Sequence, residues 1–403
     1  MKPQNRSRNA ARQRGRRAKN VQGSPAKSAS VDGGVLLATA ILASMGIVMS
    51  FSATAPLALE ATLPPLFIHH LEGLALGVVL AALCMSLSLR FWRAAAFPFW
   101  VLGVGLLVAT LLFGVEVNGA RRWLAVPGTG FRFQPVEAVK LCTVLAVALI
   151  AARPDGRAGI GDRRTLAALA VAAPPILLLL AQPDLGNAIL LAGIVALVLF
   201  VAGASIRVLL PIAAVGIAGV LFFIARNPYA WRRVAGFLDP WKDAQDSGFQ
   251  LVQSFVAFGH GGLYGVGLGN GWQKLHYLPE VHTDFVLALI AEELGLLGVL
   301  FVLGAFAALV VAGTRVARQA QNRFALLLAF GLTALLTLPA LVNAGVVMGV
   351  LPTKGLTLPF LSYGRTSLVV CLAATGILLG IARNELAPRS AAAPPITGRL
   401  PWQ

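Results

Sequence analysis

The feature that most constrains the fold of this 403-residue chain is a series of ten long apolar runs. A helix needs about 20 mostly apolar residues to cross a bilayer, and each run is close to that length or longer. The runs cover Gly33–Ser52, Phe67–Leu89, Ala94–Phe113, Gln134–Ala152, Thr165–Ala181, Asn187–Gly203, Ile206–Ala225, Thr283–Gly313, Phe324–Val347 and Thr366–Ala382. Charged residues make up only 12% of the chain, about half the share in soluble domains. The sequence therefore predicts an all-α, polytopic membrane protein with about ten transmembrane helices.

Lys and Arg are unevenly distributed between the two sides of this predicted bundle. Residues 1–30 carry nine basic residues and no acid, and if they lie inside, 22 of the 33 basic residues share that side. Because Lys and Arg concentrate in cytoplasmic connections, we expect both termini in the cytoplasm. The expected domains are a disordered basic arm (1–32), a ten-helix transmembrane domain (33–383) and a cytoplasmic tail (384–403).

The net charge of +17 is also typical of proteins that bind nucleic acid. The basic arm, however, lacks the aromatic side chains on which bases stack, whereas a basic segment beside a membrane helix attracts anionic lipids. We therefore expect membrane lipids, and no nucleic acid, as its partner. The three cysteines, Cys84, Cys142 and Cys371, all lie in apolar runs and predict neither disulfides nor a metal site.

Two of the outer connections are long, residues 118–133 and residues 227–282. The second is rich in aromatic residues and glycines, which favours an ordered extracytoplasmic loop over a flexible linker. Part of it is expected to form short amphipathic helices at the membrane interface. One helical face would gather Leu251, Val252, Phe255 and Val256. The glycine run 259–271 predicts tight turns at which the backbone can approach a ligand.

Opposite charges stand together inside the fourth run. Glu137 and Lys140 are three residues apart and therefore share a helix face. Because each charge at the centre of a bilayer costs about 2.5–3.5 kcal/mol on insertion scales, we expect the two to pair and to face the bundle interior. The pair is either a packing salt bridge or part of a cavity wall that binds an anionic group, and both roles are compatible. At least one of Glu292 and Glu293, in the eighth run, should also face the interior, paired or protonated.

Cations also stand on the outer side, against the general trend. Arg121 and Arg122, next to Trp123, either anchor the protein at the lipid headgroups or clamp a phosphate-bearing lipid, since guanidinium matches phosphate oxygens. Lys354 lies in the connection Leu351–Gly364, whose prolines and glycines bar a continuous helix. That connection is either an ordinary loop or an ordered segment beside a site, re-entrant segments included. The stretch Gln182–Gly186 reads as a tight turn.

The end of the large loop gathers Glu280, His282 and Asp284 within five residues. Two interpretations remain open for Asp284. Thr283 is the N-cap and Asp284 the first residue of the eighth helix, where acids are favoured. Alternatively, Asp284 is a general base, provided that a substrate hydroxyl reaches its carboxylate.

Seven segments follow one another in a characteristic order: NGARRWL, FQPVEAVK, QPDLG, GFQLVQS, LGNGWQKLHYLPEVHTDF, AEELG and LPTKGLTLPFLSYG. Together they resemble the SEDS family (shape, elongation, division and sporulation) from about Val35 to Arg383. Within the family, the stretch Pro352–Thr357 and the long basic arm are more similar to the cell-division members than to the elongation members. The chain departs from the family pattern at Val136, usually Ser, and at Arg365-Thr366, usually Gly-Ser.

The resemblance implies a ten-helix inverting glycosyltransferase that polymerises lipid II into peptidoglycan strands on the outer face of the cytoplasmic membrane during septal wall synthesis. A class B penicillin-binding transpeptidase and other divisome membrane proteins would be its partners. The resemblance places the essential base at Asp284, which would take a proton from the acceptor sugar hydroxyl.

The remaining site candidates follow from charge and from side of the membrane. Four cations are candidates for binding the pyrophosphate: Arg121, Arg122, Lys274 and Lys354. Glu137 and Lys140 would shape the central cavity, and Glu280 and His282 would support the base. No cofactor is implied with certainty, although a divalent cation, Mg²⁺ or Mn²⁺, would offset the charge of the leaving group.

Three alternative functions stay open at this point. A lipid II flippase would need charged residues along the whole transport path, whereas the polar residues here crowd the outer half. A non-catalytic scaffold of the division complex would tolerate replacement of Asp284. Within the family, the elongation polymerase is the alternative to the division polymerase.

Overall fold

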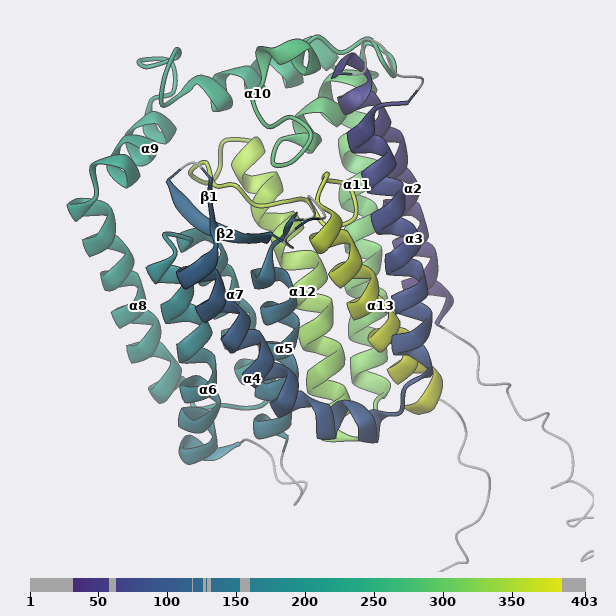
Figure 1. Cartoon of the computed structure of the whole chain (residues 1–403), viewed down its shortest axis with the longest axis vertical. Helices are drawn as coiled ribbons and strands as arrows, with labels where there is room; N and C mark the ends of the chain where they lie inside the picture. Colours follow the sequence, from purple (N-terminus) through teal and green to yellow (C-terminus); the bar gives the residue numbers. More distant parts are fainter. Residues whose placement is uncertain are drawn as a thin grey trace, which may run out of the picture.

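The computed structural model describes residues 32–57, 63–117, 119–125, 128, 132–152 and 160–385. In this part of the chain ten long helices form one bundle (Figure 1). They are α2 (Gly33–Thr54), α3 (Pro65–Ser86), α4 (Leu89–Phe113), α5 (Pro135–Ala151), α6 (Gly161–Ala181), α7 (Leu185–Val201), α8 (Ile206–Arg226), α11 (Val286–Gln319), α12 (Arg323–Val347) and α13 (Arg365–Glu385). Eight are long and apolar enough to cross a membrane, while α5 and α7 have 17 residues each. The prediction of a polytopic, ten-helix membrane protein is confirmed.

Several helix starts differ from the sequence-based boundaries by one to five residues, and two of them are explained by their N-caps. Helix α4 begins at Leu89, five residues before the expected Ala94, because the Ser88 hydroxyl caps it by accepting from the Phe91 amide at 3.3 Å. Helix α11 begins at Val286, with Phe285 as its N-cap, so Asp284 lies outside the helix. The basic arm expected at 1–32 and the tail expected at 384–403 fall almost entirely outside the described residues.

Short elements cover one end of the bundle. The large loop contains α9 (Pro228–Leu238), α10 (Phe249–Gly261) and the single π-helical turn η2 (Gln273–Tyr277), and α9 and α10 lie across that end (Figure 1). A small antiparallel sheet, β1 (Val115–Val117), β2 (Ala120–Ala125) and β3 (Arg132–Phe133), joins α4 to α5. The sequence did not predict these strands. A one-turn 3-10 helix, η1 (Ala55–Leu57), follows α2.

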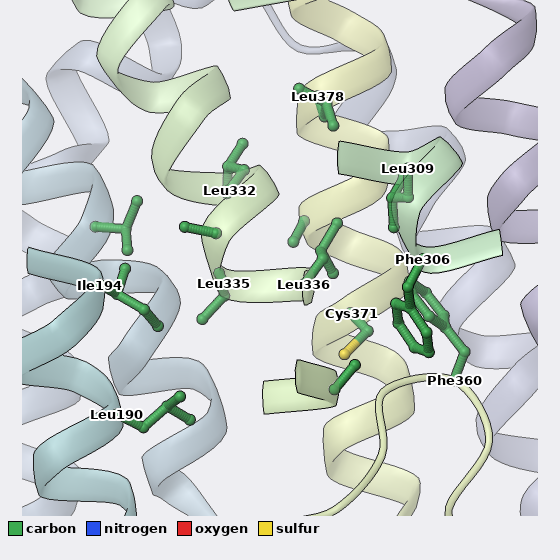
Figure 2. Close-up of a cluster of buried hydrophobic side chains, with 14 of the residues drawn as sticks. Leu190, Ile194, Phe306, Leu309, Leu332, Leu335, Leu336, Phe360, Cys371 and Leu378 are labelled. Carbon is green, nitrogen blue, oxygen red and sulfur yellow. The ribbon is translucent and has the colours of Figure 1, made fainter. Parts of the chain in front are cut away.

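Helix α12 occupies the middle of the bundle and contacts α5, α7, α11 and α13. Its apolar side chains interleave with those of its neighbours, as Figure 2 shows for Leu332 and Leu335 beside α7. In the same core, Phe306 of α11 packs beside the loop that carries Phe360. Helix α8 is the opposite case, since none of its residues is buried and it stands at the edge of the bundle (Figure 1). A wholly apolar helix with no protein cover faces lipid along its length.

The helix α11 is broken at Gly295, whose φ of 68° and ψ of −168° are not helical. The glycine-rich segment that follows α10 fills the break with its own backbone. The Leu296 amide donates to Gly262 O at 2.9 Å, and the Val266 amide donates to Glu292 O at 3.0 Å. The loop therefore supplies partners for backbone groups that a continuous helix would satisfy internally.

The predicted close approach of the glycine run is thus an approach to α11 itself. A Cβ atom at Gly261 would collide with Ala291 O, and one at Gly265 would collide with Glu293 O. Helix α10 also packs inward, with Leu251 and Val252 buried, although Val256 stays exposed. The expected amphipathic helix exists. Part of its apolar face packs on α11 and on the end of α12, and part of it, including Val256, stays exposed.

A buried ion pair joins α2, η2 and α11 below this loop. Lys274 Nζ lies 2.6 Å from Glu293 Oε1 and donates to Ser52 Oγ at 3.0 Å, and the Ser52 hydroxyl donates to the Glu293 carboxylate at 2.7 Å. Glu293 is fully buried and Lys274 nearly so. The carboxylate of the neighbouring Glu292, also fully buried, accepts from His260 Nδ1 at 3.0 Å and from the Trp272 amide at 2.9 Å. Both glutamates therefore face the interior and are paired.

We expect Lys274→Met to lower the free energy of unfolding by about 3–5 kcal/mol, because it leaves the Glu293 carboxylate buried without its partner. The double variant Lys274→Met/Glu293→Gln should recover a large part of that loss. Melting temperatures in detergent measure both effects, with Lys242→Met, at an exposed lysine of the same loop, as the control. Equal melting of Lys274→Met and wild type would show that the pair contributes nothing.

We expect Gly295→Ala to destabilise the fold by about 1–3 kcal/mol, a range typical of overpacking. Its φ is positive, and the added Cβ would lie 2.5 Å from Leu263 O. Gly304→Ala is the matched control in the same helix, because a Cβ at Gly304 would meet nothing within 4 Å. The same melting experiment checks this expectation, and a neutral Gly295→Ala beside a neutral Gly304→Ala would contradict it.

Candidate functional site

The candidate base Asp284 lies in a tight turn immediately before α11. Glu280 adopts a left-handed conformation with a φ of 56°, and its carbonyl accepts from the amides of Thr283 at 3.1 Å and Asp284 at 3.0 Å. The Thr283 hydroxyl donates to Glu280 Oε2 at 2.9 Å. The capping alternative is wrong in this structure, since Phe285 is the N-cap and accepts through no side chain. Asp284 is therefore placed by the turn and by its neighbours rather than by a capping role.

Asn343 of α12 connects this turn to the connection between α12 and α13. Its side-chain amide donates to Asp284 O at 2.7 Å and to Leu356 O at 2.7 Å. Asn343 is only 1% exposed, so both hydrogen bonds are shielded from water. The backbone of the candidate base and the 351–364 loop are consequently held at a fixed separation.

The same loop is tied to the turn at two further points. The Ser362 hydroxyl donates to Thr283 O and accepts from the Leu358 amide, the latter at 2.7 Å. The Tyr363 amide donates to His282 O at 2.8 Å, with the two rings 6.0 Å apart. The 351–364 connection is therefore an ordered segment packed onto the candidate base, as one of the two sequence interpretations expected.

The loop backbone touches the Asp284 carboxylate itself. A Cβ atom at Gly355 would lie 2.7 Å from Asp284 Oδ2, which leaves no room for a side chain there. Lys354 directly precedes this glycine, and its side chain reaches the turn before α7, because a Cβ at Gly186 would lie 3.8 Å from Lys354 Cδ. The predicted third outer cation thus stands beside the candidate base.

Two arginines from distant parts of the chain complete the group. Arg122 of β2 donates from Nη2 to Pro183 O at 2.5 Å, in the turn that Lys354 also approaches. Arg233 of α9 donates from Nη1 to Thr353 O at 3.4 Å. Asp184 caps α7 in the same turn, accepting from the Asn187 amide at 3.2 Å. Arg233, Arg122 and Asp184 therefore act electrostatically on both Asp284 and Lys354, and Glu280 acts on Asp284.

These charges and the burial of the group shift the pKa values of the site. Burial and the Glu280 carboxylate raise the pKa of Asp284 to about 7, against the opposing effect of Arg233 and Arg122. Burial, followed by Arg233, lowers the pKa of Lys354. Burial also lowers the pKa of His282 despite the nearby Glu280. A carboxyl group that titrates near neutral pH is suited to accept a proton from a hydroxyl at physiological pH.

A chain of buried polar groups runs from this site into the bundle. Lys140 Nζ lies 2.8 Å from Glu137 Oε1 and donates to Asn187 Oδ1 at 3.2 Å. The side-chain amide of Asn187 donates to Asp184 Oδ2 at 2.9 Å, and Ser367 Oγ donates to Glu137 Oε2 at 3.3 Å. The predicted Glu137–Lys140 pair that faces the interior is confirmed, and it is linked through hydrogen bonds to the turn beside Lys354.

A small polar cavity adjoins this chain. Its walls include Glu137, Lys140, Asn187, Gly355, Thr357 and Ser367. The space that the centre of a water molecule can occupy is about 30 Å³. Since a single water needs about 10–15 Å³ by this measure, the cavity in this conformation is wide enough for water but not for a sugar ring.

Two of the predicted site residues lie elsewhere. Arg121 alternates to the opposite side of β2 from Arg122 and pairs with Glu116 at 3.7 Å, where both side chains are about half exposed or more. Lys274 is committed to the buried pair with Glu293. Neither is placed with the Asp284 group, so the pyrophosphate assignments of Arg121 and Lys274 find no support in this geometry.

The sequence interpretation missed Arg233 and Asn343. The signal for Arg233 was a second pair of outer arginines, Arg232-Arg233, directly after the seventh run. The signal for Asn343 was a lone amide in an otherwise apolar run, since polar residues in membrane helices usually have a specific partner. Among the residues that the structure describes, no group of three His, Cys, Asp or Glu side chains is arranged to hold a metal ion. No step is assigned to a divalent cation.

Comparison with known proteins gives consistent relatives. A family profile described as "Cell cycle protein", covering FtsW, RodA and SpoVE, matches residues 34–386. The probable peptidoglycan glycosyltransferase FtsW of Geobacter metallireducens is 39% identical over 353 residues, which are 86% of this chain and 93% of that protein. The protein of the same name from Halomonas elongata is 40% identical over 377 residues, 91% of this chain and 94% of that one.

Solved structures share the fold. A chain of the complex described as "Structural coordination of polymerization and crosslinking by a peptidoglycan synthase complex" matches with a TM-score of 0.74 and 30% identity, covering 89% of this chain and 99% of that one. The crystal structure of the rod shape determining protein RodA from Thermus thermophilus matches with a TM-score of 0.65 and 31% identity, covering 88% and 98%. The length of these matches and the order of the shared segments lead to one conclusion: the chain belongs to the FtsW/RodA/SpoVE family of cell cycle proteins.

Proposed function

We propose that this protein is a peptidoglycan glycosyltransferase that polymerises lipid II into glycan strands during septal wall synthesis. The observation that carries the proposal is the position of Asp284, a partly buried carboxyl group whose pKa is raised to about 7 and which lies within electrostatic range of Arg233 and Arg122. The relatives named peptidoglycan glycosyltransferase FtsW favour the division role over the elongation role.

The chemistry of lipid II matches this arrangement. Lipid II is a disaccharide-peptide joined to undecaprenol through a pyrophosphate, so transfer has to form one glycosidic bond and break one bond from sugar to phosphate. The Asp284 carboxylate takes the proton of the acceptor hydroxyl, whose oxygen attacks the anomeric carbon with inversion. The bonding electrons leave with undecaprenyl pyrophosphate. Arg122 and Lys354 stabilise the negative charge that develops on this leaving group.

Glu137, Lys140, Glu280 and His282 take supporting roles in this proposal. Glu280 raises the pKa of Asp284, and His282 holds the 351–364 loop through its carbonyl group. The Glu137–Lys140 pair forms the inner wall of the polar cavity that adjoins Gly355. The cavity is too narrow for a sugar, so substrate entry requires the surrounding helices or the loop to separate.

The orientation follows from the distribution of basic residues. With both termini in the cytoplasm, the end of the bundle that carries α9, α10 and Asp284 faces the outside, where lipid II is polymerised. The proposed location is the cytoplasmic membrane at the division septum. The proposed partners are a class B penicillin-binding transpeptidase of the FtsI type, supported by the likeness to a chain of a peptidoglycan synthase complex, and other divisome membrane proteins.

Lipid II polymerisation by the purified protein tests the function, alone and with its cognate transpeptidase. We expect Asp284→Asn to lose at least about a hundredfold in rate, because the amide cannot accept the proton. Asp246→Asn, at an exposed acid of the same outer loop, is the matched control and should retain activity. Melting temperature in detergent checks that both variants are folded.

The outcomes separate the alternatives. A folded Asp284→Asn variant that polymerises at the wild-type rate would place the base elsewhere. A wild-type protein that makes no glycan even with its partner, but moves lipid II across proteoliposome membranes, would be a flippase. A protein that does neither, while still binding the transpeptidase, would be a scaffold.

The pH dependence of the rate reports the state of Asp284. Because the carboxylate is the active form and its pKa is about 7, the rate should rise about tenfold per pH unit below that value and level off above it. Arg122→Ala removes a charge that lowers this pKa and should move the midpoint to higher pH. Glu280→Gln removes a charge that raises it and should move the midpoint to lower pH. Midpoints that stay at the wild-type value in both variants would contradict the assignment of the base.

A further inference from the structure

We propose that Arg233, carried by the amphipathic helix α9, is a third cation of the leaving-group site and binds the diphosphate directly. The inference rests on the proposed glycosyltransferase function and extends it to a residue in a different element. It concerns a diphosphate ester of a long isoprenoid alcohol, whether that ester belongs to the donor substrate or to the released product.

The register of α9 turns Arg233 toward the site. With 3.6 residues per turn, Arg233 shares a face of α9 with Gly236 and Phe237. This face is packed, since Gly236 is buried and a Cβ there would lie 2.7 Å from Ser247 Oγ. The opposite face carries Trp231, 57% exposed, and Leu238, 72% exposed.

The apolar outer face of α9 is matched to the outer leaflet. Helix α9 begins at Pro228, two residues after α8 ends, and the Asn227 side chain between them accepts from the Ala230 amide at 3.2 Å. Since α8 has no buried residue and faces lipid, α9 starts at the level of the headgroups. A short helix there seats its aromatic and aliphatic side chains in the interface. Because lipid lies on one face of α9 and the 351–364 loop on the other, the Arg233 side chain is directed toward the loop.

Three consecutive residues of that loop bring Arg233 together with the groups already assigned. Thr353 O accepts from Arg233 Nη1, Lys354 approaches the turn that binds Arg122, and Gly355 touches Asp284 Oδ2. Arg233 thus contacts the loop one residue before Lys354, whereas Arg122 contacts the turn that the Lys354 side chain approaches.

The placement of three cations around one loop suits a polyanionic ligand. Besides burial, Arg233 and Arg122 lower the pKa of Lys354 and Asp184 raises it, so both guanidinium groups lie within electrostatic range of that ammonium group. Burial disfavours the charged form of the ammonium group, and an anion bound beside it offsets that cost. A diphosphate provides several negative oxygens for two planar guanidinium groups and one ammonium group.

The same arrangement connects the leaving group with the base. Arg233 acts on the Asp284 pKa more strongly than Arg122 does. Once the diphosphate neutralises Arg233 and Arg122, their lowering effect on that pKa weakens, so donor binding should move the pH midpoint of the reaction upward.

The test compares Arg233→Ala and Arg233→Lys with Arg232→Ala, an exposed arginine one position away on the same helix. Initial rates of polymerisation are measured over a range of lipid II concentrations, with farnesyl diphosphate as a competing diphosphate ester and inorganic pyrophosphate as a second competitor. We expect Arg233→Ala to lower kcat/KM and to weaken inhibition by farnesyl diphosphate about 10- to 100-fold, the effect of losing a charge-assisted contact. Arg233→Lys should lie between, and Arg232→Ala should stay within about twofold of wild type, as surface changes usually do.

Inhibition separates binding from a structural role. If Arg233 only holds the loop through Thr353, Arg233→Ala will lower kcat but leave the inhibition constant for farnesyl diphosphate at the wild-type value, and the inference is overturned. Loss of inhibition by both competitors places Arg233 on the diphosphate itself. Loss for farnesyl diphosphate alone places it on the isoprenoid chain and also overturns the inference.

Failure of the proposed function is recognised separately. If the wild-type protein makes no glycan, the increase in its melting temperature caused by farnesyl diphosphate still reports binding. A shift that persists in Arg232→Ala, is smaller in Arg233→Lys and disappears in Arg233→Ala supports the diphosphate site without the polymerase. An equal shift in all variants, or no shift in any of them, overturns it.

Discussion

A charge taken into the apolar part of a bilayer has to be paired, and this constraint determines which elements of the protein meet. Lipid is as apolar as leucine, so helices in a membrane gain little from the hydrophobic effect when they pack together. Polar contacts then specify the arrangement. Lys140 reaches from α5 to Asn187 of α7, and Lys274 connects Glu293 of α11 to Ser52 of α2. These contacts join segments that lie far apart in the sequence and leave apolar packing, as in Figure 2, to fill the space between them.

The site lies where that constraint is relaxed. At the outer ends of the helices, charged groups keep access to water, so Arg122, Arg233 and Lys354 can approach one another at a moderate cost. Backbone carbonyl groups help to place the two guanidinium groups, since Arg122 donates to Pro183 O and Arg233 donates to Thr353 O. A carbonyl contact of this kind holds a guanidinium group without neutralising its charge. The partly buried position of the group explains how a carboxyl can titrate near neutral pH within reach of two arginines.

Much of this arrangement could be predicted from the sequence, because periodicity and charge act locally. The ten spans, the Glu137–Lys140 pair and the ordered 351–364 loop all follow from residues close together in the chain. The choice between Arg121 and Arg122 could not be predicted, because it depends on the alternation of a short strand that gives no clear pattern. The fate of Lys274 depends on a partner 19 residues away and on a helix break.

The remaining differences have the same origin in long-range contacts. Arg232 and Arg233 are equivalent by composition, and only the register of α9 against the 239–248 turn distinguishes them. The glycines of the large loop were expected to approach a ligand, whereas they approach the backbone of α11. A glycine in a sequence indicates that another group approaches the backbone closely, but it does not identify that group.

The break at Gly295 makes the outer part of α11 a lever arm. The segment Val286–Leu294 is separated from the longer, lipid-spanning part, and Asp284 stands two residues before its first residue, which lies roughly 14 Å from the pivot at the helical rise per residue. A rotation of roughly 5° at the pivot would displace the carboxylate by more than an ångström, and a misplacement of about 1 Å can cost a hundredfold in rate. The hydrogen bonds between the glycine loop and the pivot therefore influence the position of the Asp284 carboxylate, which they do not contact. A displacement of that loop would change the reactivity of Asp284 by moving it relative to the substrate.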